Sequence, residues 1–243
     1  HEIIHNDKIV GGIDDKSTNY VKKFFSKIIK GNIHKTNSQT AELCKLVENS
    51  FRDLNIAFAN QISMLCSNNN IDYLHLINLA NQHKRVNILS PSIGVGGHCI
   101  PVDPVFLVDL DKKNSSLISL SRSINIKKTN WIYSKIINEL DALIQKNKNN
   151  YKILCLGLSY KSNVGDIRES PALKIFKKLK KDKRFIVHSH DPYINMNEPY
   201  MITQLNHLKR YDIFLKLVDH DIFKKLSYKN LFKKKKLIDL SHS

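Results

Sequence analysis

The sequence predicts an α/β protein in which a long-helix region separates two regions of parallel β-sheet. Three observations carry this prediction. A strand, a helix and a strand follow one another within the first 36 residues, residues 37–148 are dominated by helical patterns, and short apolar runs alternate with helical or polar segments from Tyr151 onward. Hydrophobic residues make up 42% of the 243 positions, which is enough for one or two buried cores.

The amino-terminal region is predicted to form a single βαβ unit. Residues 8–12 end a short strand, apolar residues at positions 21, 24, 25, 28 and 29 recur at helical spacing, and residues 33–36 form a second strand. Such a unit cannot cover both faces of its sheet and needs neighbours to be stable. We therefore expect residues 1–36 to be the end of a larger domain, and the first residue is His1 rather than Met.

The central region, residues 37–148, is expected to hold three helices. The first begins after Asn37 or Ser38, either of which is a suitable N-cap, and runs to about Cys66; the others span residues 71–83 and 115–147. A loop rich in Gly and Pro occupies residues 88–105. The first helix carries one apolar stripe at steps of three and four, formed by Leu43, Val47, Phe51, Leu54, Phe58, Ile62 and Leu65.

The carboxyl-terminal region, residues 149–243, is expected to form a parallel sheet after a Lys/Asn-rich boundary at residues 146–150. Its candidate strands are 151–158, 184–192, 211–220 and 235–240. Ser170 as N-cap and Pro171 as first helical residue begin a helix whose amino end can face an anion.

Charge and cysteine usage narrow the class of protein. The formal net charge of +17 favours anionic partners such as nucleic acid, acidic lipid or phosphorylated small molecules. The basic runs 177–184 and 233–236 lack the interleaved aromatics of nucleic-acid stacking surfaces, and no apolar run approaches the roughly 20 residues of a membrane span.

The four cysteines are scattered and form no C-x-x-C pair, which fits a reducing, cytoplasmic setting. His98 and Cys99 lack the spacing of metal ligands, so we expect no bound metal.

Cys99 is the candidate nucleophile. It follows Gly94, Gly96 and Gly97, which let the backbone approach a ligand closely, and Asp103 lies four residues further on. The alternative is an ordinary turn with a buried thiol. We interpret the remaining cysteines, which lie on apolar helices or a strand, as structural: Cys44, Cys66 and Cys155.

Two further clusters can bind anionic groups. Lys45 and Asn49, one helical turn apart and continued by Arg52, can hold an oxygen that becomes negative during a reaction; the alternative is a solvated helix face. The second expected helix ends with His83, Lys84 and Arg85, and interaction of these cations with the helix dipole is sufficient to explain them. The functional alternative is that His83 and Arg85 contact a phosphate or a sugar. A third set follows a strand end and precedes a helix, where open α/β sheets bind ligands: Tyr160, Lys161 and Arg168.

At these residues the sequence resembles the UDP-glucose/GDP-mannose dehydrogenase family. The similar segments occur in family order over nearly the whole chain: NDKIVGG, TNSQTAELCKLVENSFRDLNIAFANQIS, NQHKRVNIL, GVGGHCIPVDP, GLSYKSNVGDIRESPAL and LVDHDIF. The resemblance implies that residues 1–36 are the remnant of an NAD-binding Rossmann domain. It further implies that residues 37–148 are the central dimerisation and catalytic domain, and that residues 149–243 are a Rossmann-like UDP-binding domain.

The resemblance also implies a reaction and roles. Family members use two NAD to oxidise the C6 hydroxyl of a UDP-sugar to a carboxylate through an enzyme thioester, here supplying acidic sugar for a surface polysaccharide. Carried over, Cys99 is the nucleophile, Lys45 and Asn49 hold the reacting oxygen, and Asp103 assists the hydrolytic water. The substrate-contacting positions are Arg52, His83, Arg85, Gly96, Tyr160 and Lys161, and Arg168 contacts the cofactor. A homodimer through the central helices is implied as well.

Several departures from the family pattern bear on these expectations. Lys84 and Gly165 differ from the usual residues without touching a proposed reacting group, whereas His98 and Val102 point toward the N-acetylhexosamine branch of the family. None of the 8 glycines forms G-x-G-x-x-G, so we expect this chain to bind NAD poorly and not to turn over. Two alternatives stay open: another UDP-sugar 6-dehydrogenase, and a non-catalytic basic module.

Overall fold

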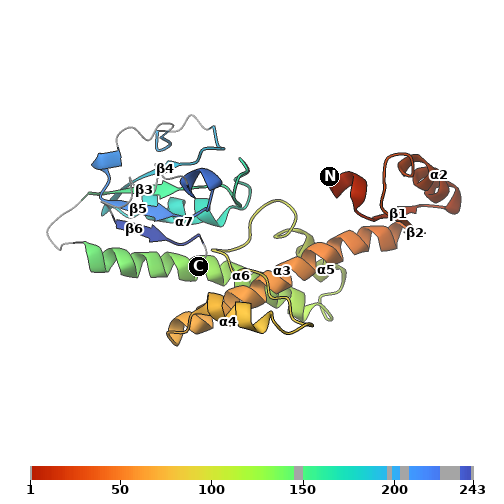
Figure 1. The fold of residues 1–243 in the computed structure, drawn as a ribbon, viewed down its shortest axis with the longest axis horizontal. Helices are drawn as coiled ribbons and strands as arrows, with labels where there is room; N and C mark the ends of the chain where they lie inside the picture. The colour runs from red at the N-terminus through yellow and green to blue at the C-terminus, as the bar shows by residue number, and fades with distance from the viewer. Residues whose placement is uncertain (1, 145–149, 196–198, 203–207, 225–235, 242–243) are drawn as a thin grey trace. The chain divides into compact units, whose positions relative to one another are not determined.

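A computed structural model describes residues 2–144, 150–195, 199–202, 208–224 and 236–241. The chain divides into two compact units, residues 1–51 and 52–243. Figure 1 labels the helices and strands of both units.

The first unit contains the expected βαβ motif. After α1 (Glu2–His5), β1 (Lys8–Gly12) pairs in parallel with β2 (Ile33–Asn37), and α2 (Asp15–Phe25) connects them. Helix α2 begins with a capping box, in which the Asp14 carboxylate accepts the Ser17 backbone N–H at 2.6 Å. The helix ends at Phe25, so the expectation of helical positions for Ile28 and Ile29 is wrong: they lie in and after the turn that follows.

Helix α3 (Ser38–Asn68) is the long helix that the sequence predicts. Of the two candidate caps, Asn37 fills the role, because its side-chain oxygen accepts the Thr40 backbone N–H at 2.8 Å. Much of the apolar stripe is exposed to solvent, with 67% of Phe51, 48% of Phe58 and 53% of Leu65 accessible. These three side chains of the stripe are therefore not buried in the unit to which each belongs.

The rest of the central region differs from expectation at its helix ends. Helix α4 spans Tyr73–Ala80 rather than residues 71–83, because the Asp72 carboxylate caps its start and Asn81 caps its end. The Asn81 side chain also exchanges two hydrogen bonds with the backbone of Ile88, at 2.7 and 3.0 Å, which turns the chain away from the helix. Helix α5 (Asp103–Leu110) begins inside the expected loop, and α6 (Ser116–Leu143) follows.

Helix α6 packs on the second-unit part of α3 through buried polar side chains. Arg122 forms an ion pair with Asp53, which is fully buried, and the Asn125 amide donates to the same carboxylate at 2.8 Å. One turn further on, the fully buried Lys128 ammonium donates to the Ser63 hydroxyl at 2.6 Å and lies over the Trp131 ring. Burial, with a smaller contribution from the nearby Lys135, lowers the pKa of Lys128 to about 7.

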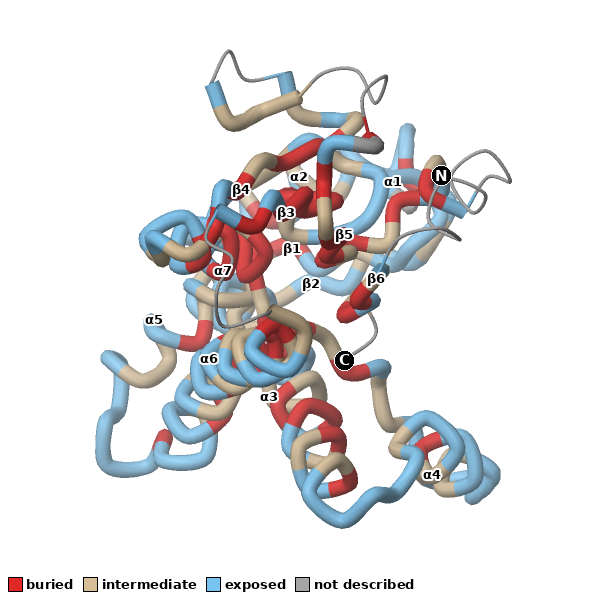
Figure 2. The backbone as a smooth tube through the Cα atoms, turned by 90° about the vertical axis from the view of Figure 1, so that its left-hand side faces the viewer, coloured by how far each residue is buried: buried red, intermediate tan, exposed pale blue. Residues whose placement is uncertain are grey.

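The carboxyl-terminal region is the parallel sheet that the sequence predicts. Its strand order is β4-β3-β5-β6, from β3 (Tyr151–Leu156), β4 (Phe185–His190), β5 (Ile213–Lys216) and β6 (Lys236–Asp239), with short turns η1 (Leu208–Arg210) and η2 (Asp221–Lys224). Helix α7 (Pro171–Lys180) and the second half of α6 pack against this sheet and complete its core. Figure 2 shows the buried residues gathered in β3 and α7.

The four thiols have different environments. Cys66 and Cys155 are fully buried, and burial raises the pKa of the Cys155 thiol. Cys44 and Cys99 are partly accessible. The burial of Cys66 and Cys155 agrees with the structural role that the sequence predicts. Cys44 is partly accessible, although the sequence predicted a buried thiol there.

Among the described residues, no helix combines the length and the apolar character that crossing a bilayer requires.

Candidate functional site

Cys99 lies at the end of the glycine loop, immediately before α5. Its backbone carbonyl accepts the N–H groups of Val102 and Asp103 at 2.9 and 2.8 Å, so a tight turn connects it to the first residue of the helix. The thiol is partly accessible. The alternative of a buried structural thiol is therefore wrong for Cys99.

The glycines of this loop let a second segment pack directly against it. A Cβ at Gly96 would lie 2.7 Å from Cβ of Tyr160, and one at Gly97, whose φ is +93°, would lie 3.0 Å from the Tyr160 ring. The Gly97 backbone N–H also donates to the Arg168 carbonyl at 2.9 Å. The structure thus brings the loop of Cys99 together with the segment that carries Tyr160, Lys161 and Arg168.

Tyr160 and Lys161 follow the carboxyl end of β3, as the sequence predicts. The Lys161 ammonium lies 5.6 Å from the centre of the Tyr160 ring, a cation–π contact that keeps the exposed amine beside the ring. The crevice at the carboxyl ends of parallel strands is where open α/β sheets bind ligands. An aromatic ring and an ammonium at this position can bind a negatively charged nucleotide.

Arg168 is held in place by Asp166. Its guanidinium forms a forked interaction with that carboxylate, at 2.7 to 3.1 Å, while 61% of the side chain stays exposed. Hydrogen bonding from Arg168 lowers the pKa of Asp166 to about 2. The same pairing raises the pKa of Arg168, and Tyr160 and Cys99 act on it in the same direction from nearby.

A buried network beneath the Tyr160 turn was not found from the sequence. Oδ2 of Asp191, at the end of β4, accepts the backbone N–H groups of Leu158 and Ser159 at 2.7 and 3.0 Å, and lies 3.1 Å from Nε2 of His220. On its other side, Nδ1 of His220 accepts the Asn163 backbone N–H at 2.9 Å. A signal for both residues was present, because each lies at the carboxyl end of a predicted strand, within the motifs HDP and VDH.

Lys45 and Asn49 belong to the first unit and differ in environment. Lys45 is exposed and forms an ion pair with Glu48 at 3.5 Å, whereas Asn49 is 6% accessible. The solvated-face interpretation therefore fits Lys45 and fails for Asn49. Arg52, the next position on this side of α3, is exposed. The convergence of Lys45 and Asn49 with Cys99 stays a prediction.

His83 and Arg85 lie beyond α4 and not at its end, so the interpretation of these residues as helix caps is wrong. Both are exposed, and the Arg85 backbone N–H donates to Nδ1 of His83 at 3.3 Å. Among the described residues, no hydrogen bond or ion pair links either side chain to the glycine loop. Their contact with a substrate stays a prediction.

The amino end of helix α2 in the first unit does not suit an anion. The residues around the carboxyl ends of β1 and β2 enclose a depression that includes Gly12, Thr18 and Lys35. The amino end of α2 is occupied by the Asp14 carboxylate and followed by Asp15, so it offers an anion a negatively charged surface. Within the described residues, no cluster of His, Cys, Asp and Glu is arranged to hold a metal ion.

Comparison with known proteins identifies the family. Residues 39–127 match the central domain of the UDP-glucose/GDP-mannose dehydrogenase family, and residues 154–242 match its UDP-binding domain. The chain belongs to this family. The central-domain match contains Lys45, Asn49, Cys99 and Asp103, and the UDP-binding match contains Tyr160, Lys161 and Arg168.

Several characterised members of the dehydrogenase family are similar to this chain. UDP-N-acetyl-D-mannosamine dehydrogenase of Campylobacter jejuni is 46% identical over 178 residues, which cover 73% of this chain and 42% of that protein. NDP-N-acetyl-D-galactosaminuronic acid dehydrogenase of Ralstonia nicotianae is 38% identical over 224 residues, covering 90% and 52%. The chain thus spans about half the length of the curated relatives that it matches.

A solved structure of the family supports the fold assignment. The UDP-D-ManNAc dehydrogenase of Pyrococcus horikoshii superposes with a TM-score of 0.86 at 34% identity, over 99% of this chain and 57% of that one. The expected α/β class with Rossmann-like parallel sheets is therefore confirmed.

Proposed function

We propose that this chain carries the substrate-binding and thiol-bearing part of a UDP-N-acetyl-D-mannosamine 6-dehydrogenase, which forms the corresponding uronate for surface polysaccharide synthesis. The observation that carries the proposal is the packing of the Cys99 loop on Tyr160 through Gly96 and Gly97. This packing supports the proposal because the loop that carries the partly accessible Cys99 lies against the turn that follows β3. The identity to the mannosamine enzymes supports the choice of sugar.

The proposed chemistry uses the thiol as a nucleophile. The Cys99 thiolate adds to the C6 aldehyde of the half-oxidised sugar, and the carbonyl electron pair moves to oxygen, where Lys45 and Asn49 stabilise the negative charge. At the thioester stage, Asp103 assists a water molecule that attacks the acyl carbon and releases the Cys99 thiol. Tyr160 and Lys161, with Arg52, His83 and Arg85, bind the nucleotide sugar.

The complete four-electron oxidation uses two NAD as hydride acceptors, and a pyrophosphate cradle for them is not supplied by the described residues. Arg168 is the one proposed cofactor contact in this chain. We therefore expect that this chain alone binds NAD weakly and forms no NADH with UDP-N-acetyl-D-mannosamine. Rapid NADH formation by the purified 243-residue chain would contradict this.

Thiol protection tests the site without requiring NAD. In a Cys44→Ser background, mass spectrometry follows the alkylation of Cys99 by iodoacetamide. We expect saturating UDP-N-acetyl-D-mannosamine to slow this alkylation at least tenfold. Lys161→Ala should remove the protection at the same sugar concentration, and Lys183→Ala, an exposed matched lysine, should retain it. Equal alkylation with and without bound sugar nucleotide would contradict the proposal.

The Ralstonia relative supports a second candidate substrate, the N-acetylgalactosamine nucleotide. Its match covers 90% of this chain, whereas the match of the mannosamine enzyme covers 73%. Calorimetric titration with UDP-N-acetylmannosamine, UDP-N-acetylgalactosamine and UDP-glucose separates the candidates. Tightest binding of the mannosamine nucleotide is the expected result. A preference for the galactosamine nucleotide would assign the chain to the second activity.

The exposed stripe of α3 supports a homodimer as the working form. Phe51, Phe58 and Leu65 present large apolar side chains to solvent, and a second copy would cover them. Light scattering should give twice the mass of 28.1 kDa. Phe58→Glu should shift the protein to the monomer.

A further inference from the structure

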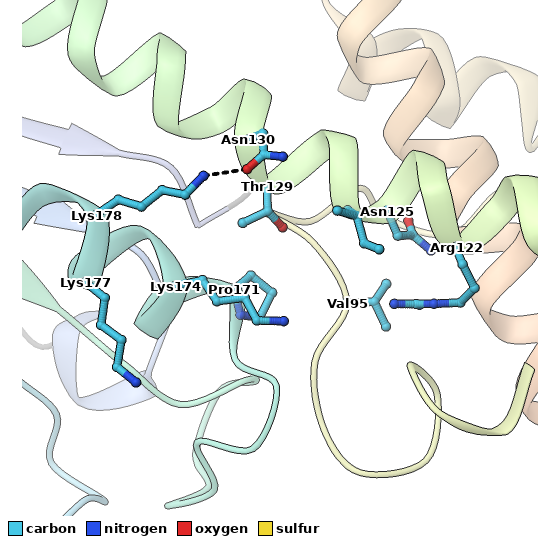
Figure 3. A pocket seen from close by; sticks show the side chains of 10 residues that line it. Val95, Arg122, Asn125, Thr129, Asn130, Pro171, Lys174, Lys177 and Lys178 are labelled. Atoms are coloured by element: carbon cyan, nitrogen blue, oxygen red, sulfur yellow. Dashed lines mark hydrogen bonds between the residues drawn. The ribbon is translucent and has the colours of Figure 1, made fainter. Parts of the chain in front are cut away.

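A cavity on the second unit borders the glycine loop and has lining residues of its own. It has a volume of about 270 Å³ and is enclosed by α6, α7 and Val95 of the glycine loop (Figure 3). Cys99, Tyr160, Lys161 and Arg168 do not line it. The cavity is therefore a second candidate site beside the one proposed above, and a ligand in it can be tested separately.

The walls of the cavity are strongly cationic. Arg122 comes from α6, Lys174, Lys177 and Lys178 come from α7, and none of the described lining residues is acidic. Lys177 and Lys178 follow Lys174 by three and four residues, so each is its neighbour on the helix surface, and Figure 3 shows their side chains diverging. Figure 3 shows the Arg122 and Lys174 side chains extending toward each other from the two helices.

The existing contacts leave about two of these charges uncompensated. Arg122 is paired with Asp53, and Lys174 lies 2.5 Å from Glu169. The Lys178 ammonium donates to the neutral side-chain oxygen of Asn130 at 2.6 Å and lies 5.2 Å from the centre of the Tyr133 ring. Within the described part of the chain, no carboxylate lies within ion-pair distance of Lys177 or Lys178.

The remaining surface also suits a small ligand. The Thr129 hydroxyl, held close to Gly94, adds a hydrogen-bonding group, and Val95, Ile126 and Pro171 supply apolar walls. The volume corresponds to about nine water molecules at roughly 30 Å³ each, which excludes a whole nucleotide sugar but admits a molecule of about that many heavy atoms. Two uncompensated positive charges match a dianion.

We propose that this cavity binds a small dianionic phosphorylated molecule at a site separate from the UDP site. The phosphate group lies between Arg122 and the lysines of α7, and the apolar walls contact the rest of the molecule. A ligand held there contacts the glycine loop through Val95 on one side and the start of α7 through Pro171 on the other.

Titration calorimetry with inorganic pyrophosphate as the probe tests the proposal. The 243-residue chain is first saturated with UDP, so that the proposed UDP site cannot take the probe. We expect one pyrophosphate to bind per chain. The double variant K174Q/K178Q should weaken this binding at least tenfold, whereas K181Q/K183Q, with the same charge change on exposed lysines outside the cavity, should stay within twofold. Arg122 is left intact, because its removal would leave Asp53 buried without its cation.

Three results would overturn the proposal. One is the absence of pyrophosphate binding once UDP is saturating, since the probe then binds only at the UDP site. Another is an equal loss of affinity in K181Q/K183Q, which would mean general attraction to a basic surface. The third is citrate binding as tightly as pyrophosphate with the same dependence on Lys174 and Lys178, which would assign the cavity to polycarboxylates. Circular dichroism of both double variants establishes that they are folded.

Discussion

Nε2 of His220 lies 3.1 Å from Oδ2 of Asp191, and both side chains are fully buried at the carboxyl edge of the sheet. The pair joins the end of β4 to the segment after β5, and Asn163 ties it to the turn that carries Tyr160 and Lys161. The backbone N–H of Asn163 donates to Nδ1, so Nε2 carries the imidazole proton and donates to Asp191. His220 is therefore a positioning residue for this turn.

Removal of this imidazole should weaken both the fold and the site. His220→Ala leaves the Asn163 N–H and part of the Asp191 carboxylate without partners, and we expect the free energy of unfolding to fall by about 2–3 kcal/mol. UDP affinity should fall as well, because the Tyr160 turn loses its support. Urea denaturation and UDP titration measure the two effects. His75→Ala, at an exposed position, should change stability by less than about 0.5 kcal/mol; an equal effect there would contradict the argument.

A methyl group at Gly96 should separate the Cys99 loop from Tyr160. The added Cβ would meet Cβ of Tyr160 at 2.7 Å and the Glu169 carbonyl at 2.9 Å, so one segment must move. We expect Gly96→Ala to weaken UDP binding about tenfold, equivalent to about 1.4 kcal/mol. Val95→Ala, one residue earlier on the loop, should stay within about twofold. Unchanged affinity in Gly96→Ala would show that the close packing is not required.

The buried ion pair between α3 and α6 should be sensitive to the loss of one partner. Arg122→Leu leaves the Asp53 carboxylate buried without its cation, and we expect a loss of about 3–5 kcal/mol in chemical denaturation. The double variant Arg122→Leu/Asp53→Asn should recover part of this loss, since no charge then stays buried. Arg184→Leu breaks a solvent-exposed cluster instead and should cost less than about 1 kcal/mol.

Lys128 should give the protein a distinct dependence on pH. Burial lowers its pKa to about 7, whereas lysine in an unfolded chain titrates near 10.4. Between these values the unfolded state binds more protons, so stability rises with pH; below about pH 7 the cost of the buried ammonium is fully present.

Lys128→Met should abolish this rise. The difference in unfolding free energy between the wild type and the variant should change between about pH 7 and about pH 10, with a limiting slope of about 1.4 kcal/mol per pH unit. Urea denaturation across this range measures it, and the exposed Lys127→Met serves as the control. Parallel stability curves for wild type and Lys128→Met would contradict the prediction.

Local signals predicted much of the fold. The βαβ unit, the start of α3 and the Ser170 cap of α7 follow from residues adjacent in sequence, and so does the parallel sheet. The end of α4 was missed because it depends on hydrogen bonds between Asn81 and Ile88 that no periodicity encodes. Helix α5 was missed because its sequence DPVFLVDL is apolar on nearly every side and lacks a helical stripe.

The site could be predicted only where linear motifs determine it. The glycines before Cys99 and the Tyr160–Lys161 pair were recognisable as motifs, and the structure brings these two segments together. Their support by Asp191 and His220 was not recognised, because these residues lie 29 positions apart and meet only when β4 and β5 join one sheet. Pairings of this kind depend on strand order, which the sequence does not state.

The burial of Cys66 and Cys155 makes thiol reagents a measure of local opening. Cys66 lies near the end of α3 and Cys155 inside the parallel sheet, and neither is accessible in the folded chain. In native conditions a thiol reagent should react readily with Cys44 and Cys99, which are partly accessible, and slowly with the two buried cysteines. The slow rates then report separately how often the helical region and the sheet admit solvent, without any engineered label.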